Sequence, residues 1–288
     1  MNWHKLSPAV LTSMVFILAQ GVGTFLIFFV GMLVSPDFKA VVYAFITGEA
    51  QGASFSSQAV VSFFAISLIV VDILAVVICY FLLRYIRIVT AADIASINWK
   101  RTIPGIAAGI LGAFCISVLT EDVELPDMMK QLTLALSHNV WGVLTLVITG
   151  PVAEELLCRE AIEGEMLRRG AKPWTAIIVS ALAFSILHLN FAQGLYALPL
   201  GIVFGIIYYK TGNIVVTTLL HILNNGFAAV QLFSLDESYD ETSYADLFGS
   251  TTATYAIAAL CGLLCLVFIK VFWDCYRPRG ETKKNGPT

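Results

Sequence analysis

The chain has 288 residues, of which 58% are hydrophobic and 13% are charged, and its formal net charge at pH 7 is -3. A soluble domain has about 25% charged residues, so this composition excludes an ordinary soluble protein. Repeated apolar runs of about 20 residues predict an all-α, polytopic membrane protein, because a helix satisfies its own backbone hydrogen bonds in lipid. The lipid bilayer is therefore an expected partner, and nucleic acid is not.

Eight apolar runs have the length expected of membrane-spanning helices. They cover residues 8–34, 60–83, 102–120, 132–157, 174–190, 193–209, 213–233 and 252–273. The first run is too long for the apolar part of a signal peptide and is predicted to be a retained span. Residues 37–59 are broken by Gly48, Glu49, Gly52 and serines, which leaves open a loop or an interfacial helix.

The alternation of basic and acidic turns predicts the orientation. All but Lys39, Lys130 and Arg159 of the 17 basic residues fall on one side of the predicted spans. The positive-inside rule then puts both termini in the cytoplasm, and we expect a multi-pass protein of a bacterial plasma membrane. We divide the chain into N-terminal spans and loops (1–131), a catalytic membrane core (132–233), and a C-terminal part (234–288). This last part combines an outer acidic loop, the last span and a basic tail.

Small residues within the runs predict close helix contacts. Gly105 with Gly109, and Gly201 with Gly205, each form a G-x-x-x-G pair of the kind that lets helix backbones approach. Asp72 is a lone acid inside the second run; it serves either a polar cavity or a hydrogen bond to a neighbouring helix. The six cysteines occur in apolar runs, beside the acidic motif or in the basic tail, so we expect no disulfide framework.

A charged cluster lies at the end of the fourth run, where ionisable groups are costly and therefore indicate a functional site. Glu155 and Arg159 are four residues apart, which places them on one helix face as a pair. Glu154 is rotated from Glu155 by about 100°, so its carboxylate faces another direction. One carboxylate is neutralised by a fixed cation, and the other remains available for chemistry.

Two further polar clusters occur in the following runs: Phe184 with His188, and His221 with Asn225. A carboxylate and an imidazole together can deprotonate and orient water. A second imidazole with an asparagine amide can stabilise an oxyanion. Alternatively, Glu154, His188 and His221 match the ligand set of a catalytic zinc that keeps one site for water. The residues alone leave these two chemistries open.

The three clusters together resemble the motifs of the CPBP family of CAAX-protease and bacteriocin-processing intramembrane peptidases. The similarity covers residues 150–226 and includes the segment Glu154-Glu155-Leu156-Leu157-Cys158-Arg159. It implies that Glu154 and His188 activate water and that His221 and Asn225 bind the oxyanion. It also implies supporting roles for Glu155 and Arg159, and packing of Phe184 beside the site. Implied substrates are membrane-associated peptides or proteins, prenylated for part of the family, and its members are classed both as metalloproteases and as glutamate-dependent proteases.

Two other functions compete with the endopeptidase hypothesis. A non-catalytic immunity or binding protein would tolerate the loss of Glu154 and His188, whereas a proton-coupled transporter would use Asp72, Glu154 and His188 as a relay.

The predicted spans also contain a conflict of depth. Glu154 lies close to the cytoplasmic end of a span that finishes at residue 157, but His188 lies about 21 Å into the next span. We therefore predict a break or kink at Gly150-Pro151 that starts a new helix at Val152 and moves the acidic motif deeper.

Overall fold

The computed structural model describes residues 2–47, 58–121, 123, 130–234 and 243–276, and within these ranges it contains helices and no strand. The α-helices are α1 (Trp3–Val34), α2 (Pro36–Thr47), α3 (Gln58–Ile78), α4 (Ala91–Ala95), α5 (Trp99–Glu121), α6 (Lys130–Ser137), α7 (Val140–Leu144), α8 (Gly150–Glu155), α9 (Glu165–Arg168), α10 (Pro173–Leu187), α11 (Phe191–Thr211), α12 (Ile214–Ser234), α13 (Tyr244–Phe248) and α14 (Thr251–Cys275). Three π-helical segments continue these helices at Cys79–Leu83, Thr145–Thr149 and Leu156–Gly164.

Among the residues that the structure describes, seven continuous helical stretches are long and apolar enough to span a membrane, which confirms a polytopic helical bundle. They are Trp3–Val34, Gln58–Leu83, Trp99–Glu121, Val140–Arg168, Phe191–Thr211, Ile214–Phe233 and Thr251–Cys275. The remaining predicted span is α10, an apolar helix of 15 residues. Its length of about 22 Å is less than the membrane core of about 30 Å. Of residues 37–59, those up to Thr47 belong to α2, and 48–57 lie outside the described residues.

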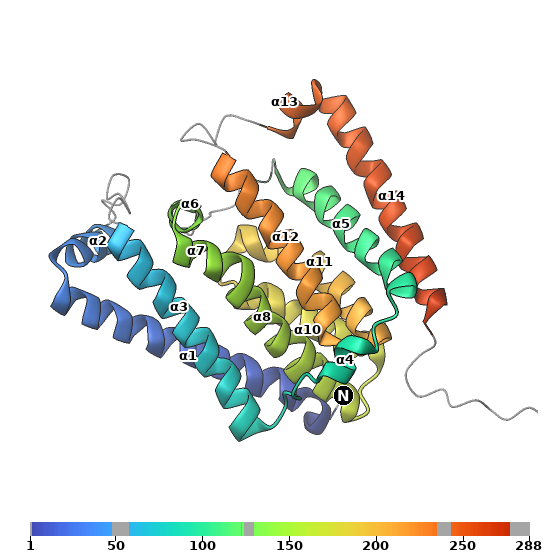
Figure 1. Ribbon diagram of the computed structural model, residues 1–288, viewed down its shortest axis with the longest axis horizontal. Coiled ribbons are helices and arrows are strands. Elements are labelled where there is room, and N and C mark those ends of the chain that lie inside the picture. The colour runs from blue at the N-terminus through green and yellow to red at the C-terminus, as the bar shows by residue number, and fades with distance from the viewer. Residues whose placement is uncertain (1, 48–57, 122, 124–129, 235–242, 277–288) are drawn as a thin grey trace, which may run out of the picture.

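The stretch from α7 to α9 runs through the middle of the bundle (Figure 1). Helices α1 and α3 pair on one side of it, and α5 and α14 pair on the other. Helices α10 and α11 also pack extensively on each other, and α12 packs against α8. The middle stretch therefore touches both the N-terminal helix pair and the helices that carry the two histidines.

One side of the bundle collects the turns that we predict to be cytoplasmic. Lys5 Nζ, at the start of α1, donates a hydrogen bond of 2.6 Å to the Gly170 carbonyl in the turn after α9. Lys210 Nζ, at the end of α11, donates one of 2.8 Å to the Tyr276 carbonyl after α14. The beginning of α1 and the end of α14 thus lie on the same side as the α9–α10 turn.

Both glycine pairs lie where helices approach closely, as predicted. A Cβ atom at any of the four positions would lie 2.5–3.1 Å from an atom of a neighbouring helix, which is closer than ordinary van der Waals contact and explains the small residues there. The neighbours are Phe272 at Gly105, Leu220 at Gly109, Ala181 at Gly201, and Ile177 at Gly205.

The predicted break at Gly150-Pro151 is not observed, although the helix leaves regular α geometry just before it. Thr149 (φ -72°, ψ -40°) and Gly150 (φ -58°, ψ -59°) both keep helical backbone angles. The helix accommodates Pro151 by a wider turn, in which the Gly150 N–H bonds to the Thr145 carbonyl five residues earlier. A proline lacks the N–H that a regular helix needs, and a π-helical turn is one way to absorb that loss.

The depth conflict disappears because the fourth span ends later than predicted, at Arg168 rather than at residue 157. Measured from that end, Glu154 lies about 21 Å along the helix at 1.5 Å per residue. His188, which directly follows α10, lies about 22 Å from Pro173. The two helices are joined by a short turn, so they bring Glu154 and His188 to the same depth without any break.

Candidate active site

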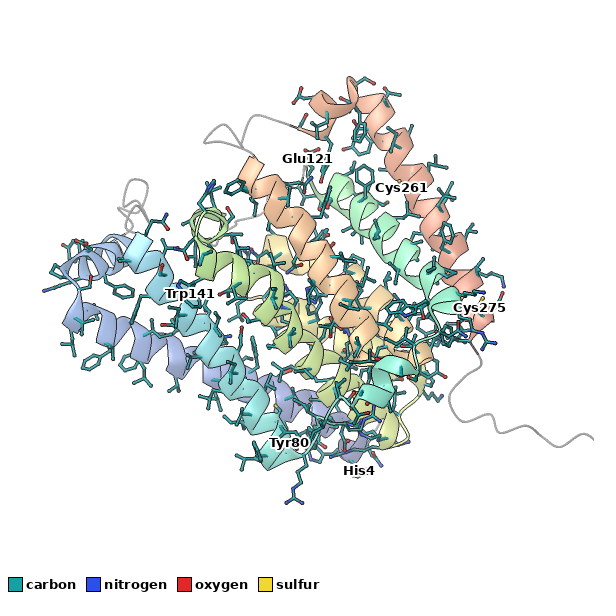
Figure 2. All side chains as sticks on the ribbon, viewed as in Figure 1. His4, Tyr80, Glu121, Trp141, Cys261 and Cys275 are labelled. Carbon is teal, nitrogen blue, oxygen red and sulfur yellow. The ribbon has the colours of Figure 1, made fainter. Side chains whose placement is uncertain are left out.

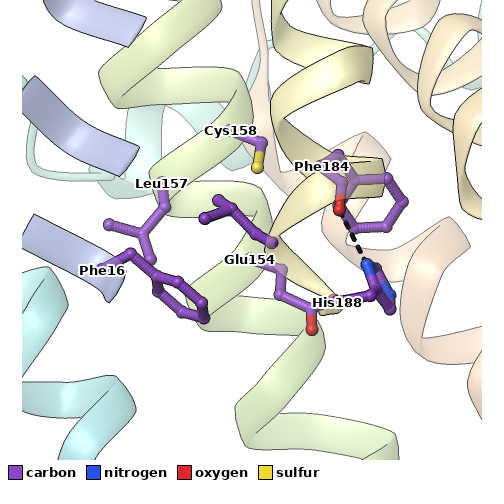
Figure 3. Close-up of a pocket in the computed structure, with 7 residues that line it drawn as sticks. Phe16, Glu154, Leu157, Cys158, Phe184 and His188 are labelled. Carbon is purple, nitrogen blue, oxygen red and sulfur yellow. Dashed lines mark hydrogen bonds between the residues drawn. The ribbon is translucent and has the colours of Figure 1, made fainter. Parts of the chain in front are cut away.

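Glu154 and His188 line one small cavity inside the bundle, shown in Figure 3. The space inside it is about 10 Å³, close to the minimum that holds one water molecule. Its walls are formed by Phe16, Glu154, Leu157, Cys158, Phe184, Leu187 and His188. The Glu154 side chain is 31% exposed and lies between Phe16 and His188, so its carboxylate is reachable from the cavity.

The second glutamate of the motif is fully buried and paired. Glu155 Oε2 accepts a hydrogen bond of 3.2 Å from Arg159 Nε, which confirms the pairing predicted from their four-residue spacing. Arg159 also donates from Nη1 to Ser180 Oγ at 2.8 Å, and Ser180 in turn donates to the Cys158 carbonyl. Removing one partner of such a buried pair leaves an uncompensated charge, so Arg159 and Glu155 are a single structural unit.

Phe184 packs against the groups on both sides of the site. The Arg159 guanidinium lies 5.1 Å from its ring centroid, within cation–π range. The same ring meets His188 edge-on at 4.9 Å and His221 edge-on at 5.5 Å. Phe184 therefore fixes the position of both imidazoles relative to Arg159, and the predicted packing role is observed.

The tautomer of His188 follows from its hydrogen bond. His188 Nδ1 lies 2.7 Å from the Phe184 carbonyl oxygen, one turn earlier on α10. A carbonyl only accepts, so Nδ1 carries the hydrogen and the neutral ring keeps its lone pair on Nε2. His188 is thus prepared to accept a hydrogen bond from a water in the cavity.

His221 bridges the two glutamates. Its Nδ1 lies 3.2 Å from Glu155 Oε1, and its Nε2 lies 3.5 Å from Glu154 Oε2. The ring is 4% exposed, so both contacts are shielded from bulk water. Both ring nitrogens of His221 therefore face carboxylate oxygens.

Asn225 is hydrogen-bonded to the π-helical segment Thr145–Thr149, which precedes α8. Its Nδ2 donates a hydrogen bond of 3.0 Å to the Leu146 carbonyl. That carbonyl has no backbone partner one turn ahead, because the Gly150 N–H bonds to Thr145 and Pro151 has no N–H. Asn224 Nδ2 donates to Asn225 Oδ1 at 3.1 Å, so the orientation of the Asn225 amide is fixed from both ends.

The structure shows no metal cluster at the residues of the alternative zinc site: among the described residues, no group of three or more His, Cys, Asp and Glu side chains is arranged to hold a metal ion. The candidate ligands Glu154, His188 and His221 are neighbours. The Nδ1 atoms of both histidines bond to protein acceptors, and His221 Nε2 lies 3.5 Å from Glu154 Oε2.

Sequence reasoning missed two further buried acids on this helix. Glu160 binds Arg87 Nε at 2.7 Å, Arg168 Nη1 at 2.8 Å and the Tyr208 hydroxyl at 2.5 Å. Glu163, four residues after Arg159, is fully buried, and its two oxygens have no hydrogen-bond partner among the described residues. The four-residue spacing of Glu163 from Arg159 could have been read from the sequence. The predicted span ended at residue 157, however, so both acids were left outside it.

The lone acid of the second span makes an interhelical hydrogen bond, one of the two alternatives considered. Asp72 on α3 accepts a hydrogen bond of 2.9 Å from Gln20 Nε2 on α1. It also lies within electrostatic range of Glu154. Asp72 therefore lies on the side of the candidate site that α1 and α3 form.

Residues 136–227 match the family model described as Type II CAAX prenyl endopeptidase, Rce1-like. The match identifies an Rce1-like domain that is similar to those of the CPBP family. The domain spans about a third of the chain and contains Glu154, His188, His221 and Asn225 together with the residues that hold them. No curated protein and no solved structure matches the chain. The domain match, together with seven apolar helices of membrane-spanning length among the described residues, supports a multi-pass membrane protein.

Proposed function

We propose that this protein is an intramembrane endopeptidase in which Glu154 and His188 activate a water molecule to hydrolyse a peptide bond. The observation that carries the proposal is the shared cavity of Glu154 and His188 within the bundle. General acid–base catalysis requires both groups to reach the same water, and their common depth meets that requirement.

In the proposed first step the water donates one hydrogen bond to Glu154 and the other to His188 Nε2. Glu154 takes a proton from this water as its oxygen attacks the carbonyl carbon of the substrate. In the second step the C–N bond breaks, and the proton held by Glu154 passes to the leaving nitrogen. The products are a carboxylic acid and an amine, which become a carboxylate and an ammonium by proton transfer through water, and both side chains return to their starting states.

The tetrahedral intermediate carries an oxyanion that needs hydrogen-bond donors. We assign this role to His221 Nε2 and to the hydrogen of the Asn225 amide that does not bond to Leu146. The two residues are one turn apart on α12, and each is already oriented by a contact on its other side. Glu155 and Arg159 support the site by fixing His221. The proposed steps use these side chains and water alone.

The proposed substrate is a peptide or protein held at the membrane, because the cavity lies among apolar helices about 20 Å from the side that collects the basic turns. A prenylated protein is one such substrate, and a bacterial plasma membrane is the proposed location.

The test is cleavage of membrane-anchored peptides by the purified protein in lipid vesicles, with the products identified by mass spectrometry. We expect two fragments separated at one peptide bond, and their formation should cease in Glu154→Gln. Binding of peptides without any cleavage would instead support the immunity or binding protein. Vesicle uptake of protons with a solute would support the transporter.

A further inference from the structure

The turn between α10 and α11 contains a backbone conformation that leucine rarely adopts. Leu189 has a φ of 51°, in the left-handed region where a residue with a Cβ atom is strained. Among the described residues, Arg84 is the only other non-glycine residue with a positive φ. The turns on either side use glycine for this conformation, Gly170 before α10 and Gly212 after α11. A leucine at position 189 therefore indicates that its side chain has a role which glycine could not fill.

Contacts between α10 and α11 impose this conformation. Ser185 Oγ, in the last turn of α10, donates a hydrogen bond of 2.7 Å to the Gly194 carbonyl in the first turn of α11. Asn190 Oδ1 accepts one of 3.1 Å from the Ala192 N–H and begins α11. Because these contacts hold the turn closed, the strain at Leu189 persists, and strain of this kind is concentrated at functional sites.

The turn also places two exposed apolar side chains beside the candidate active site. Leu189 directly follows His188, and adjacent Cα atoms are about 3.8 Å apart. Leu189 is 70% exposed and Phe191 is 79% exposed. Neither residue lines the water-sized cavity of Glu154 and His188. A polypeptide whose peptide bond reaches His188 therefore passes beside Leu189.

The depth of the turn argues against lipid as the partner of these side chains. Helix α10 has 15 residues and extends about 22 Å from the end that we predict to be cytoplasmic, in a membrane core of about 30 Å. Non-helical backbone at such a depth occurs where it is buried in protein or lines a water-filled space, and not against lipid. Leu189 and Phe191 are therefore suited to contact a substrate that enters the site.

We propose that Leu189 and Phe191 bind an apolar segment of the membrane-anchored substrate next to the scissile bond. This inference rests on the proposed function of the site. Contact with the two side chains removes apolar surface of the substrate from water and holds the polypeptide beside Glu154 and His188. Glycine at position 189 would relieve the strain but remove this contact, which explains why the turn keeps leucine.

The test measures the Kd of fluorescent membrane-anchored peptides in lipid vesicles, with Glu154→Gln present in every protein so that no peptide is cleaved. One peptide has leucines around the scissile bond, and the other has serines there. A methylene in an apolar contact changes selectivity by about 10–200-fold. We expect Leu189→Gly to raise the Kd of the leucine peptide at least about tenfold and to leave that of the serine peptide unchanged. The unfolding midpoint should stay equal or rise, because the strain is gone.

Two further variants separate the side chain from the backbone. Phe191→Ala should also raise the Kd of the leucine peptide, although its backbone is not strained. Leu189→Met keeps an apolar side chain and should bind both peptides as the parent protein does.

Arg84→Gly is the matched control, because it relieves the same left-handed conformation at the end of the second helical span. Its unfolding midpoint should respond as in Leu189→Gly, with both Kd values unchanged. An unchanged Kd of the leucine peptide in Leu189→Gly and Phe191→Ala would overturn the inference, as would equal losses for the two peptides. If the protein with Glu154 intact binds the leucine peptide through Leu189 but does not cleave it, the proposed function fails and this inference stands. Failure to bind either peptide would overturn both.

Discussion

Asn225 on α12 donates a hydrogen bond of 3.0 Å to the carbonyl of Leu146, in the π-helical segment that precedes α8. The carbonyl is available because Pro151 cannot donate to the preceding turn and Gly150 bonds to Thr145 instead. A helix irregularity on one element therefore positions a candidate oxyanion donor on another. The proline before the acidic motif acts on Asn225 rather than on the depth of Glu154.

Replacing Pro151 with alanine tests this relationship. The new N–H competes for the carbonyls of the preceding turn and releases the Asn225 amide from Leu146. We expect kcat to fall several-fold, KM to stay constant, and the free energy of unfolding to stay equal or rise by about 0.5–1.5 kcal/mol from the added hydrogen bond. Steady-state kinetics and equilibrium unfolding in detergent provide the two readouts. Pro199→Ala, within α11, is the control, and equal kinetics for both variants would contradict the role of Pro151.

The Glu155–Arg159 pair predicts a strong coupling in stability. Arg159→Met leaves Glu155 buried with His221 as its remaining ionic partner, and breaking such a pair costs about 3–5 kcal/mol. The double variant Glu155→Gln, Arg159→Met removes both charges and should lose less stability than Arg159→Met alone. Equilibrium unfolding of the wild type, the two single variants and the double variant measures the coupling. Additive losses would show that the two residues do not stabilise the fold as a pair.

Close helix packing at Gly205 predicts that a larger residue at this position lowers the stability of the fold. A Cβ atom there would lie 3.0 Å from both Glu163 Oε2 and Ile177 Cγ2. Overpacking of this kind costs about 1–3 kcal/mol, so Gly205→Ala should lower the unfolding midpoint. Gly21→Ala is the matched control, because nothing lies within 4 Å of a Cβ atom at that position. An equal effect of the two substitutions would argue against the close α10–α11 contact.

The sequence predicts the pairings in the site well because they depend on local spacing. Glu155 with Arg159 and Phe184 with His188 are both four residues apart, and a helix brings such residues together wherever it lies. The helical class and the close glycine contacts follow for the same reason.

The end of the fourth span could not be predicted in this way. Hydropathy places the end at residue 157 because Glu160 and Glu163 follow. In the structure the helix continues to Arg168 because Arg87, Arg168 and Tyr208 satisfy Glu160 inside the protein. Arg87 is 73 residues away along the chain, and no local pattern shows that the two residues meet.

The N-terminal contribution to the cavity is hidden for a related reason. Phe16 lies in an apolar run where every position resembles its neighbours, so nothing marks it as a wall of the site. Figure 2 shows side chains all along α1, and Phe16 differs from Phe25 and Phe29 in being 8% exposed rather than 68% and 50%.

The most direct test of the account is the single-turnover cleavage rate of Glu154→Gln in lipid vesicles, beside Glu121→Gln at the outer end of α5. The amide keeps the shape of the carboxylate but cannot take a proton from water. Loss of a general base lowers the rate by about 10²–10⁴-fold. We predict a loss in that range for Glu154→Gln, an unchanged rate for Glu121→Gln, and an unchanged unfolding midpoint for both. A Glu154→Gln rate within a few-fold of the wild type would contradict the assignment of Glu154 as the base.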